Sequence, residues 1–153
     1  MVSEAFPGEH SPEHDFDPDQ LSLRVRVTLA ADRTAVEPVV AQVMETVRQM
    51  KFIDGKEDAI ELALQEALAN AVVHGAKEDP TKIVECLVAG DEQRGLLIIV
   101  RDPGPGFNPE SIPSCTQGEN VYSNHGRGIF LINQLMDEVK FHKNGTEIHM
   151  VKR

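Results

Sequence analysis

Hydrophobic and polar positions alternate in some stretches of this chain and recur at helical spacing in others. Residues 21–29 alternate strictly, with Leu or Val at every second position, which predicts a strand with one buried face. Apolar residues recur every three to four positions over 32–50 and over 126–136, and each stretch predicts an amphipathic helix. Between them, residues 55–75 are rich in Ala, Leu, Glu and Gln and end in glycine, so they predict a long helix.

Two pairs of β-rich runs complete the pattern. Residues 82–89 and 95–102 flank a polar turn and predict a hairpin, and residues 139–142 and 147–151 predict another across an Asn-Gly turn. Residues 103–123 are rich in proline and glycine and predict a long loop. The order β-α-α-β-β-loop-α-β-β predicts an α+β fold, a two-layer sandwich with a mixed, mostly antiparallel sheet and the helices on one face.

The first twenty residues follow neither pattern. Residues 1–20 carry three prolines and six acidic residues, which predicts a flexible acidic leader before a single domain at 21–153. His10 and His14 lie there among carboxylates, but a solvated tail explains them better than a metal site, because no second cluster completes a coordination shell. The 153 residues are 41% hydrophobic, enough for one domain with a substantial core.

Charge and cysteine content narrow the function classes. The net charge of -10 argues against direct nucleic-acid binding, although a nucleotide needs only a local site. No apolar run reaches the length of about 18 residues that spans a membrane, and no secretory signal is visible. The two cysteines, Cys86 and Cys115, have no metal-ligand spacing and fit a reduced, cytoplasmic setting.

A polar stripe runs along the predicted helix at 55–75. Glu66, Asn70 and His74 follow one another at intervals of four residues, so they share one side of the helix, and small apolar residues flank them. A buried carboxylate or amide without a partner costs several kcal/mol. Either other side chains of the protein satisfy this stripe, or a ligand does.

A second polar group follows the predicted strand at 95–102. Asp102 leaves that strand and is followed by Gly104 and Gly106, which let a ligand come close to the backbone. Such a carboxylate can accept a hydrogen bond from the amino group of a base. A Pro-Gly turn capped by an aspartate is the alternative interpretation.

Two glycines open the predicted helix at 126–136. Gly126 and Gly128 follow the long loop, and the unpaired N–H groups at such a helix start form a favourable phosphate site. The segment has no Walker pattern, and it follows a loop rather than a strand, so it is no dinucleotide fingerprint either. An ordinary helix start is the alternative interpretation.

The three motifs together, in this order, resemble the GHKL ATP-binding superfamily, over about residues 21–153. The resemblance implies a Bergerat-type ATP-binding fold. Glu-Ala-Leu-Ala-Asn-Ala-Val-Val-His-Gly at 66–75, in a chain of single-domain length, is similar to the anti-sigma-factor serine/threonine-protein kinases. This resemblance implies a cytoplasmic kinase that uses ATP and Mg²⁺, sequesters a sigma factor and phosphorylates an antagonist protein on Ser or Thr. It also allows a homodimer.

The resemblance also implies roles for individual residues. Glu66 is expected to act as the catalytic general base, Asn70 to offer an oxygen to Mg²⁺ and to bind ATP, and Asp102 to accept from the adenine amino group. The other expected ATP-binding residues are His74, Gly104, Gly106, His125, Gly126, Arg127, Gly128 and Thr146. Packing at a helix end and strand formation are alternative roles for His74 and Thr146.

The chain departs from the family in the long loop. Members often carry a basic residue just before the last glycines, whereas residues 107–124 contain neither Lys nor Arg, which leaves His125 and Arg127 as the nearby cations. This favours a second hypothesis, in which ATP binding controls partner affinity with little or no catalysis. A third hypothesis treats all three motifs as turns and helix caps.

Overall fold

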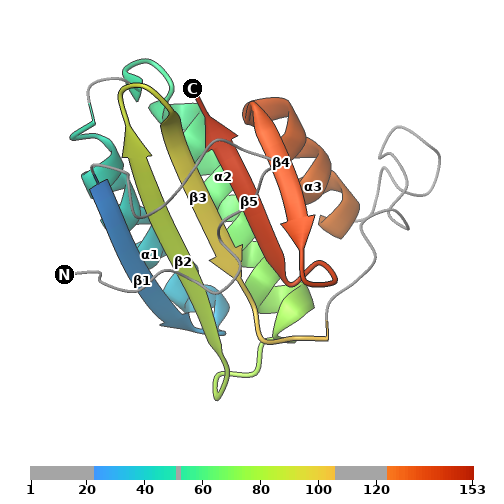
Figure 1. Ribbon diagram of the computed structural model, residues 1–153. Coiled ribbons are helices and arrows are strands. Elements are labelled where there is room, and N and C mark those ends of the chain that lie inside the picture. The colour runs from blue at the N-terminus through green and yellow to red at the C-terminus, as the bar shows by residue number, and fades with distance from the viewer. Residues whose placement is uncertain (1–22, 51–52, 106–123) are drawn as a thin grey trace.

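A computed structural model describes residues 23–50, 53–105 and 124–153. These residues form a five-stranded sheet with the helices behind it (Figure 1). In chain order the elements are β1 (Leu23–Ala30), α1 (Arg33–Val47), α2 (Glu57–Asn70), the π-helix η3 (Ala71–Gly75), β2 (Ile83–Asp91), β3 (Gly95–Arg101), α3 (Asn124–Leu135), β4 (Glu138–His142) and β5 (Glu147–Lys152).

The strands lie in the order β1-β2-β3-β5-β4, and each neighbouring pair is antiparallel. β5 lies between β3 and β4 because the last hairpin folds back toward the middle of the sheet. The predicted α+β two-layer sandwich is therefore confirmed, and the described strands contain no parallel pair.

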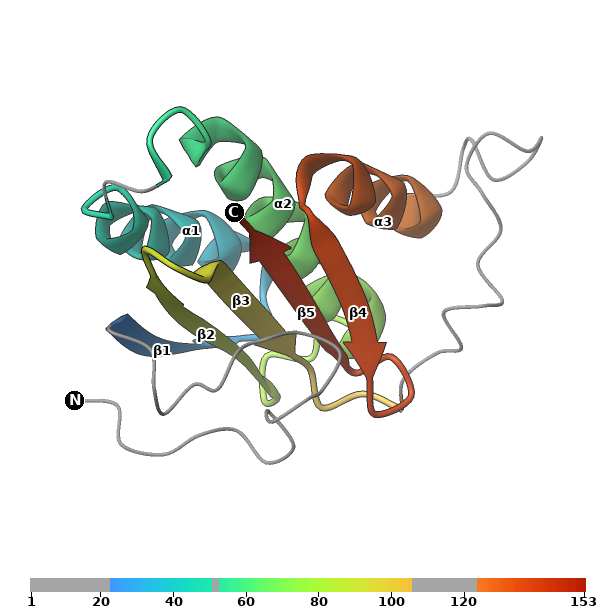
Figure 2. The ribbon, with the colours of Figure 1, turned by 45° about the horizontal axis from the view of Figure 1, so that its top comes forward.

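The helices lie on one side of the sheet, as the turned view in Figure 2 shows, and the main core lies between them and that face. Leu64 and Leu68 of α2 and Ile98 of β3 are fully buried in this core. Met44 of α1 and Ile132 of α3 belong to the same cluster. Burying a side chain of this size contributes about 2 kcal/mol. The apolar stripes that predicted the helices are thus the faces that hold them to the sheet.

The predicted element boundaries agree with the structure within a few residues, which is the usual scatter at helix and strand ends. The long helix predicted at 55–75 is not α-helical throughout, because its last turn is the π-helix η3. The leader at 1–20 and most of the loop at 103–123 lie outside the described residues. Within the described part, no helix has the length and apolar character needed to cross a membrane.

Candidate functional site

The polar stripe of α2 faces the beginning of α3. Glu66 and Asn70 lie one turn apart and are both partly buried. A Cβ on Gly128 of α3 would stand 2.9 Å from Oε2 of Glu66 and 3.1 Å from Nδ2 of Asn70. Since Gly128 has no Cβ, the two helices can approach here, and the carboxylate and the amide meet beside the α3 backbone. The first and third sequence motifs are therefore in contact.

The π-helix η3 continues the stripe toward the sheet. The N–H of Ala76 donates to the carbonyl oxygen of Ala71 at 2.8 Å, across five residues instead of four. Such wide turns shift the side chains that follow, and they occur frequently at functional sites. His74 and Gly75 from this turn line a cavity between the helices and the sheet.

The chain leaves η3 in an unusual backbone conformation. Lys77 and Glu78 both have φ of +56°, in the left-handed region that costs most residues 1–2 kcal/mol. The N–H of Glu78 donates to the carbonyl oxygen of Val72 at 2.8 Å, which holds the chain in this path. As a result, Lys77 lines the same cavity as His74.

Asp102 packs against the end of η3 so closely that only glycine fits. A Cβ on Gly75 would stand 2.3 to 2.6 Å from the carboxylate atoms of Asp102. The N–H of Gly104 donates to Oδ1 of Asp102 at 2.8 Å, which closes the turn after β3. The first and second sequence motifs therefore also meet.

The last hairpin closes the remaining side. The backbone N–H of Asp102 donates to the carbonyl oxygen of Thr146 at 2.9 Å, which joins β3 to the residues just before β5. The hydroxyl of Thr146 donates to the carbonyl oxygen of Lys143 at 2.8 Å, within the turn. Thr146 and the neighbouring Gly145 both line the cavity.

The cavity has a volume of about 190 Å³. For comparison, about 150 Å³ is enough to hold a benzene ring, so this cavity can take a planar base. Its polar lining comes from Asn70, His74, Lys77, Asp102 and Thr146, and its apolar lining from Ala67, Ala71, Val100, Ile129, Phe141 and Ile148. A pocket with apolar walls and a few convergent polar groups is typical of a small-molecule site.

Burial sets the protonation of two lining residues. Burial raises the pKa of Asp102, and the hydrogen bond from the N–H of Gly104 lowers it by a smaller amount. Burial also lowers the pKa of His74, and the positive charges of Lys77 and Arg33 act in the same direction. At neutral pH the cavity therefore presents a neutral imidazole beside a carboxylate that takes up a proton more readily than an ordinary aspartate.

The structure brings most of the expected site residues together. Four of them line the cavity (Asn70, His74, Asp102 and Thr146), and three lie against these residues without lining it (Glu66, Gly104 and Gly128). Gly126 and Arg127 belong to the first turn of α3, where Gly126 is buried and Arg127 is exposed, and neither lines the cavity. Gly106 and the side chain of His125 lie outside the described residues.

The sequence motifs do not include Lys77, which lines the cavity. The family resemblance directs attention to residues 107–124 for a cation, whereas the structure presents one from the turn after η3. The one feature of the sequence that could have pointed to Lys77 is its position two residues after Gly75, the glycine that ends the helix. Nothing in the sequence distinguishes Ile129 and Phe141 as cavity walls, because apolar residues of this kind also fill cores.

The site has few groups that bind a metal ion by themselves. Among the described residues, no three His, Cys, Asp or Glu side chains cluster in a way that could hold an ion. Mg²⁺ commonly takes only one or two protein oxygens and completes its shell with phosphates and water. The side-chain oxygen of Asn70, at the edge of the cavity, fits that requirement.

Two curated proteins are similar to this chain in sequence over about two thirds of its length. Serine-protein kinase RsbW of Bacillus mycoides (strain KBAB4) is 33% identical over 106 residues, which cover 65% of this chain and 64% of that protein. Serine-protein kinase RsbW of Staphylococcus aureus (strain MSSA476) is 34% identical over 106 residues, covering 65% and 66%. The chain thus spans slightly less than two thirds of the length of these curated relatives.

A family model covers more of the chain than these relatives do. The model described as the histidine kinase-like ATPase domain matches residues 29–152, from the end of β1 to the end of β5. That span contains all three motifs and every described wall of the cavity. With its fold, its cavity and this match in agreement, the chain belongs to the histidine kinase-like ATPase domain family.

Proposed function

We propose that this protein is a Mg-ATP-dependent serine/threonine-protein kinase of the cytoplasm that acts as an anti-sigma regulatory factor. It transfers phosphate from ATP to a Ser or Thr of an antagonist protein and sequesters a sigma factor. The observation that carries the proposal is the meeting of Asn70, Asp102 and Thr146 in one base-sized cavity. The relatives named serine-protein kinase support the choice of reaction.

The adenine end of the site is the cavity beside β3. The carboxylate of Asp102 accepts a hydrogen bond from the amino group of the base, and Gly75 and Gly104 leave room for the ring edge. Val100 and Ile148 provide apolar contact with the ring faces. A partly buried acceptor that matches a base amino group favours adenine over guanine, which has a carbonyl oxygen at that position.

The phosphate end lies toward α3. Asn70 offers its side-chain oxygen to Mg²⁺, which neutralises phosphate charge. Gly126 belongs to the first turn of α3, where the helix dipole favours an anion, and Gly128 follows directly after that turn. Lys77 adds a positive charge at the cavity wall. It neutralises phosphate charge in place of a basic residue in the loop, since residues 107–124 contain no Lys or Arg.

Glu66 is the candidate general base. Its carboxylate lies beside Asn70 at the α2–α3 contact, next to the proposed Mg²⁺ position. In the reaction, the oxygen of the substrate hydroxyl bonds to the γ-phosphorus as the bond from that phosphorus to the bridging oxygen breaks. Glu66 takes the hydroxyl proton, and ADP leaves.

A second candidate function is that of an ATP-gated binding protein with little or no kinase activity. The absence of Lys and Arg from residues 107–124 favours it, because transfer needs more charge stabilisation than binding does. In that case ATP changes the affinity for a partner protein and is not consumed.

Phosphate transfer to a partner separates the two functions. The protein is incubated with radiolabelled ATP, Mg²⁺ and its cognate antagonist protein, and calorimetry measures ATP binding separately. For a kinase, label appears on Ser or Thr, and Glu66→Gln abolishes transfer while ATP still binds. ATP-dependent recovery of the partner without label would support the gated binder. No ATP binding by the unaltered protein would reject both.

A further inference from the structure

The sheet face opposite the helices has an apolar centre. Leu87 and Ala89 of β2, Leu97 and Ile99 of β3 and Val151 of β5 form a cluster in which each residue is at most 1% exposed. The described helices pack against the other face (Figure 2). The burial of this cluster is therefore not due to the described helices, and we call it the open-face centre because none of them lies over it.

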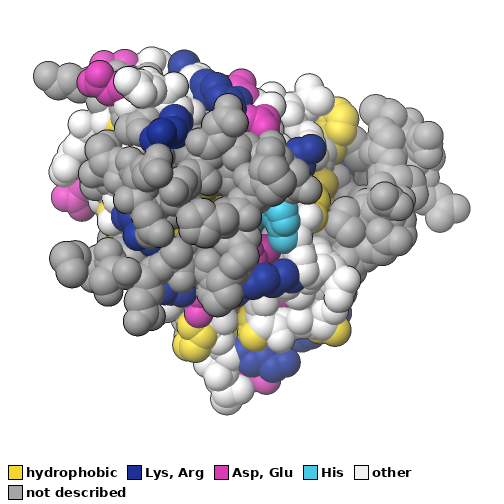
Figure 3. Space-filling model, in the orientation of Figure 1, with side chains coloured by type: hydrophobic (Ala, Val, Ile, Leu, Met, Phe, Trp, Pro, Cys, Tyr) yellow, Lys and Arg dark blue, Asp and Glu magenta, His cyan; other side chains and the backbone are white. Residues whose placement is uncertain are grey.

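Basic side chains flank the open-face centre on both sides. In the strand register, Arg24 pairs with Ala89 and Arg26 pairs with Leu87, so both arginines share this face along the edge strand β1. On the opposite side, Lys140 of β4 pairs with His149, which in turn pairs with Ile99. Figure 3 views the molecule from this side, and some Lys and Arg side chains are visible there, with Asp and Glu side chains beside them.

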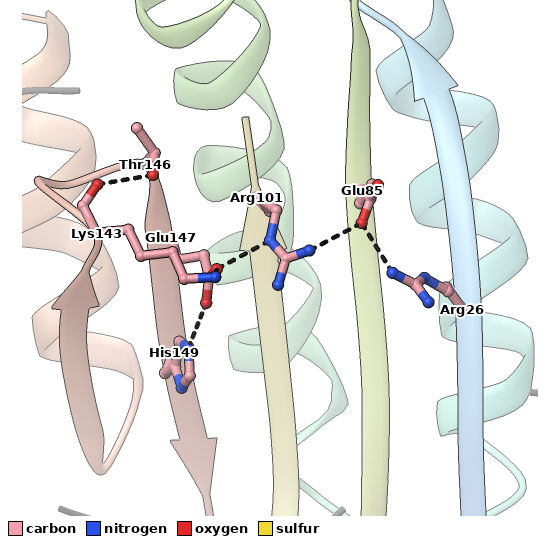
Figure 4. A network of polar contacts seen from close by, with 7 residues as sticks. All are labelled: Arg26, Glu85, Arg101, Lys143, Thr146, Glu147 and His149. Atoms are coloured by element: carbon pink, nitrogen blue, oxygen red, sulfur yellow. Dashed lines mark hydrogen bonds and ion pairs between the residues drawn. The ribbon is translucent and has the colours of Figure 1, made fainter. Parts of the chain in front are cut away.

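Ion pairs connect Arg26 with other charged side chains of this face across the strands (Figure 4). Nη2 of Arg26 lies 3.0 Å from Oε2 of Glu85. Nη1 of Arg101 forms a second ion pair with the same oxygen, at 3.4 Å. Nε of Arg101 donates to Oε2 of Glu147 at 2.9 Å. Nζ of Lys143 lies 3.0 Å from the same oxygen. The pairing holds this row of charges in place along one end of the centre.

The charge balance of this face differs from that of the chain. Among the described side chains, five Lys and Arg share the face with three Glu: Arg24, Arg26, Arg101, Lys140 and Lys143 against Glu85, Glu138 and Glu147. The whole chain, by contrast, has a net charge of -10. An apolar centre with a surplus of positive charge is complementary to a segment that combines apolar and acidic side chains.

We propose that the acidic leader, residues 1–20, docks on the open-face centre of its own chain. It has the matching composition, with six acidic residues and two phenylalanines, Phe6 and Phe16. It is also attached at the right place, because it joins β1, the edge strand that carries Arg24 and Arg26. A docked leader shields the centre from water, and any protein that binds this face must displace it.

The leader is long enough for this task. Twenty extended residues span about 66–72 Å, whereas five strands are only about 20 Å wide. Its attachment to β1 also keeps its effective concentration near the face in the millimolar range, which favours docking within one chain over docking between chains.

Paramagnetic broadening tests the proposal in the full chain. A nitroxide is attached at Ser11→Cys in a Cys115→Ser background, in which the remaining Cys86 is fully buried. We expect the methyl signals of Leu97 and Ile99 to lose most of their intensity. The methyl signals of Ile60, which is buried among the helices, should lose far less.

Charge variants test the recognition itself. Replacing Asp15, Asp17 and Asp19 of the leader by Asn should restore the intensity of the open-face signals. A matched set on exposed positions of the body, Glu37→Gln, Glu45→Gln and Asp54→Asn, should leave the broadening unchanged. If the leader variants and the body variants changed the broadening equally, the contact would depend on net charge alone, and this result would contradict the proposal.

A mixed sample separates the leader from a second copy of the chain. One chain carries the nitroxide without isotope labels, and the other carries methyl labels without a nitroxide. Docking within one chain predicts no broadening in this sample. Broadening of Leu97 and Ile99 here would assign the face to a second copy. Uniform or absent broadening in the singly labelled chain would overturn docking altogether.

Discussion

A Cβ on Gly104 would stand only 2.0 Å from the carbonyl oxygen of Gly75. This is well inside the contact distance of the two atoms, so the turn after β3 and the end of η3 touch through their backbones. Asp102 completes the contact, since it accepts from Gly104 and leaves no room for a side chain on Gly75. Two motifs that are distant in sequence are thus held together by the absence of side chains.

Gly104→Ala is therefore expected to destabilise the fold. The new methyl group meets backbone, which cannot move aside as a flexible side chain can, and such overpacking costs about 1–3 kcal/mol. Urea unfolding measures the change in the free energy of unfolding. Pro103→Ala, at an exposed neighbour in the same turn, serves as the control and should change stability much less. Equal stability of Gly104→Ala and the unaltered protein would contradict the observed contact.

Gly128→Ala should separate stability from activity. Gly128 lies inside α3, where alanine favours the helix by about 1 kcal/mol. Its new methyl group, however, would stand 2.9 Å from the flexible end of Glu66, which must turn away from Asn70. We expect thermal stability that is equal or higher, together with a loss of phosphate transfer. Transfer at the normal rate would remove Glu66 from the proposed chemistry.

Adenosine binding should weaken as the pH falls. The pKa of Asp102 is raised, so this carboxylate takes up a proton, and becomes a weaker acceptor, at a higher pH than an ordinary aspartate. Below that pKa each pH unit costs up to about tenfold in affinity. Calorimetry with adenosine, from about pH 8 to about pH 5, avoids the titration of phosphate groups. Asp102→Asn should bind weakly and without this pH dependence.

Lys77→Ala should weaken ATP binding far more than adenosine binding. A charge-assisted contact to phosphate is worth about 1.5–3 kcal/mol, or about 10- to 150-fold in affinity. Both Lys and Ala carry a Cβ, so the left-handed backbone at this position is equally strained in the two proteins. Lys82→Ala, at an exposed lysine outside the cavity, is the control. An equal loss of affinity for ATP and for adenosine would mean that Lys77 contacts the base or the ribose and not the phosphates.

Glu147→Gln should destabilise the protein at neutral pH. Burial alone would raise the pKa of Glu147, but the hydrogen bonds from His149 and Lys143 and the charge of Arg101 outweigh it and hold the pKa at about 2. A lowered pKa means that the stabilisation is complete above the ordinary value of 4.5 and is lost as the pH falls through about 2. The shift corresponds to a loss on the order of 3 kcal/mol at pH 7.

Unfolding curves at several pH values check this prediction. The difference in unfolding free energy between the unaltered protein and Glu147→Gln should shrink as the pH decreases below about 4.5. Glu45→Gln, at an exposed position on α1, should show little difference at any pH. A difference that stays constant down to low pH would show that Glu147 acts through packing and not through its charge.

The sequence by itself determined the elements and the order of the three motifs. Strict alternation at 21–29 and helical spacing at 55–75 are local properties, because the side-chain directions of strands and helices repeat every two and every 3.6 residues. The apolar face predicted for residues 21–29 therefore already includes Leu29, which is buried in the core. Asn70 and Asp102 could likewise be named as candidates from residue type and spacing.

Only the tertiary structure decided which of these residues meet. The widened turn η3 rests on a hydrogen bond between Ala76 and Ala71 that periodicity does not reveal, and it leads the chain to Lys77. The closeness of Gly75 to Gly104 depends on how a helix end packs against a strand end. Contacts of this kind depend on distance in space, which hydrophobic patterning along the chain does not encode.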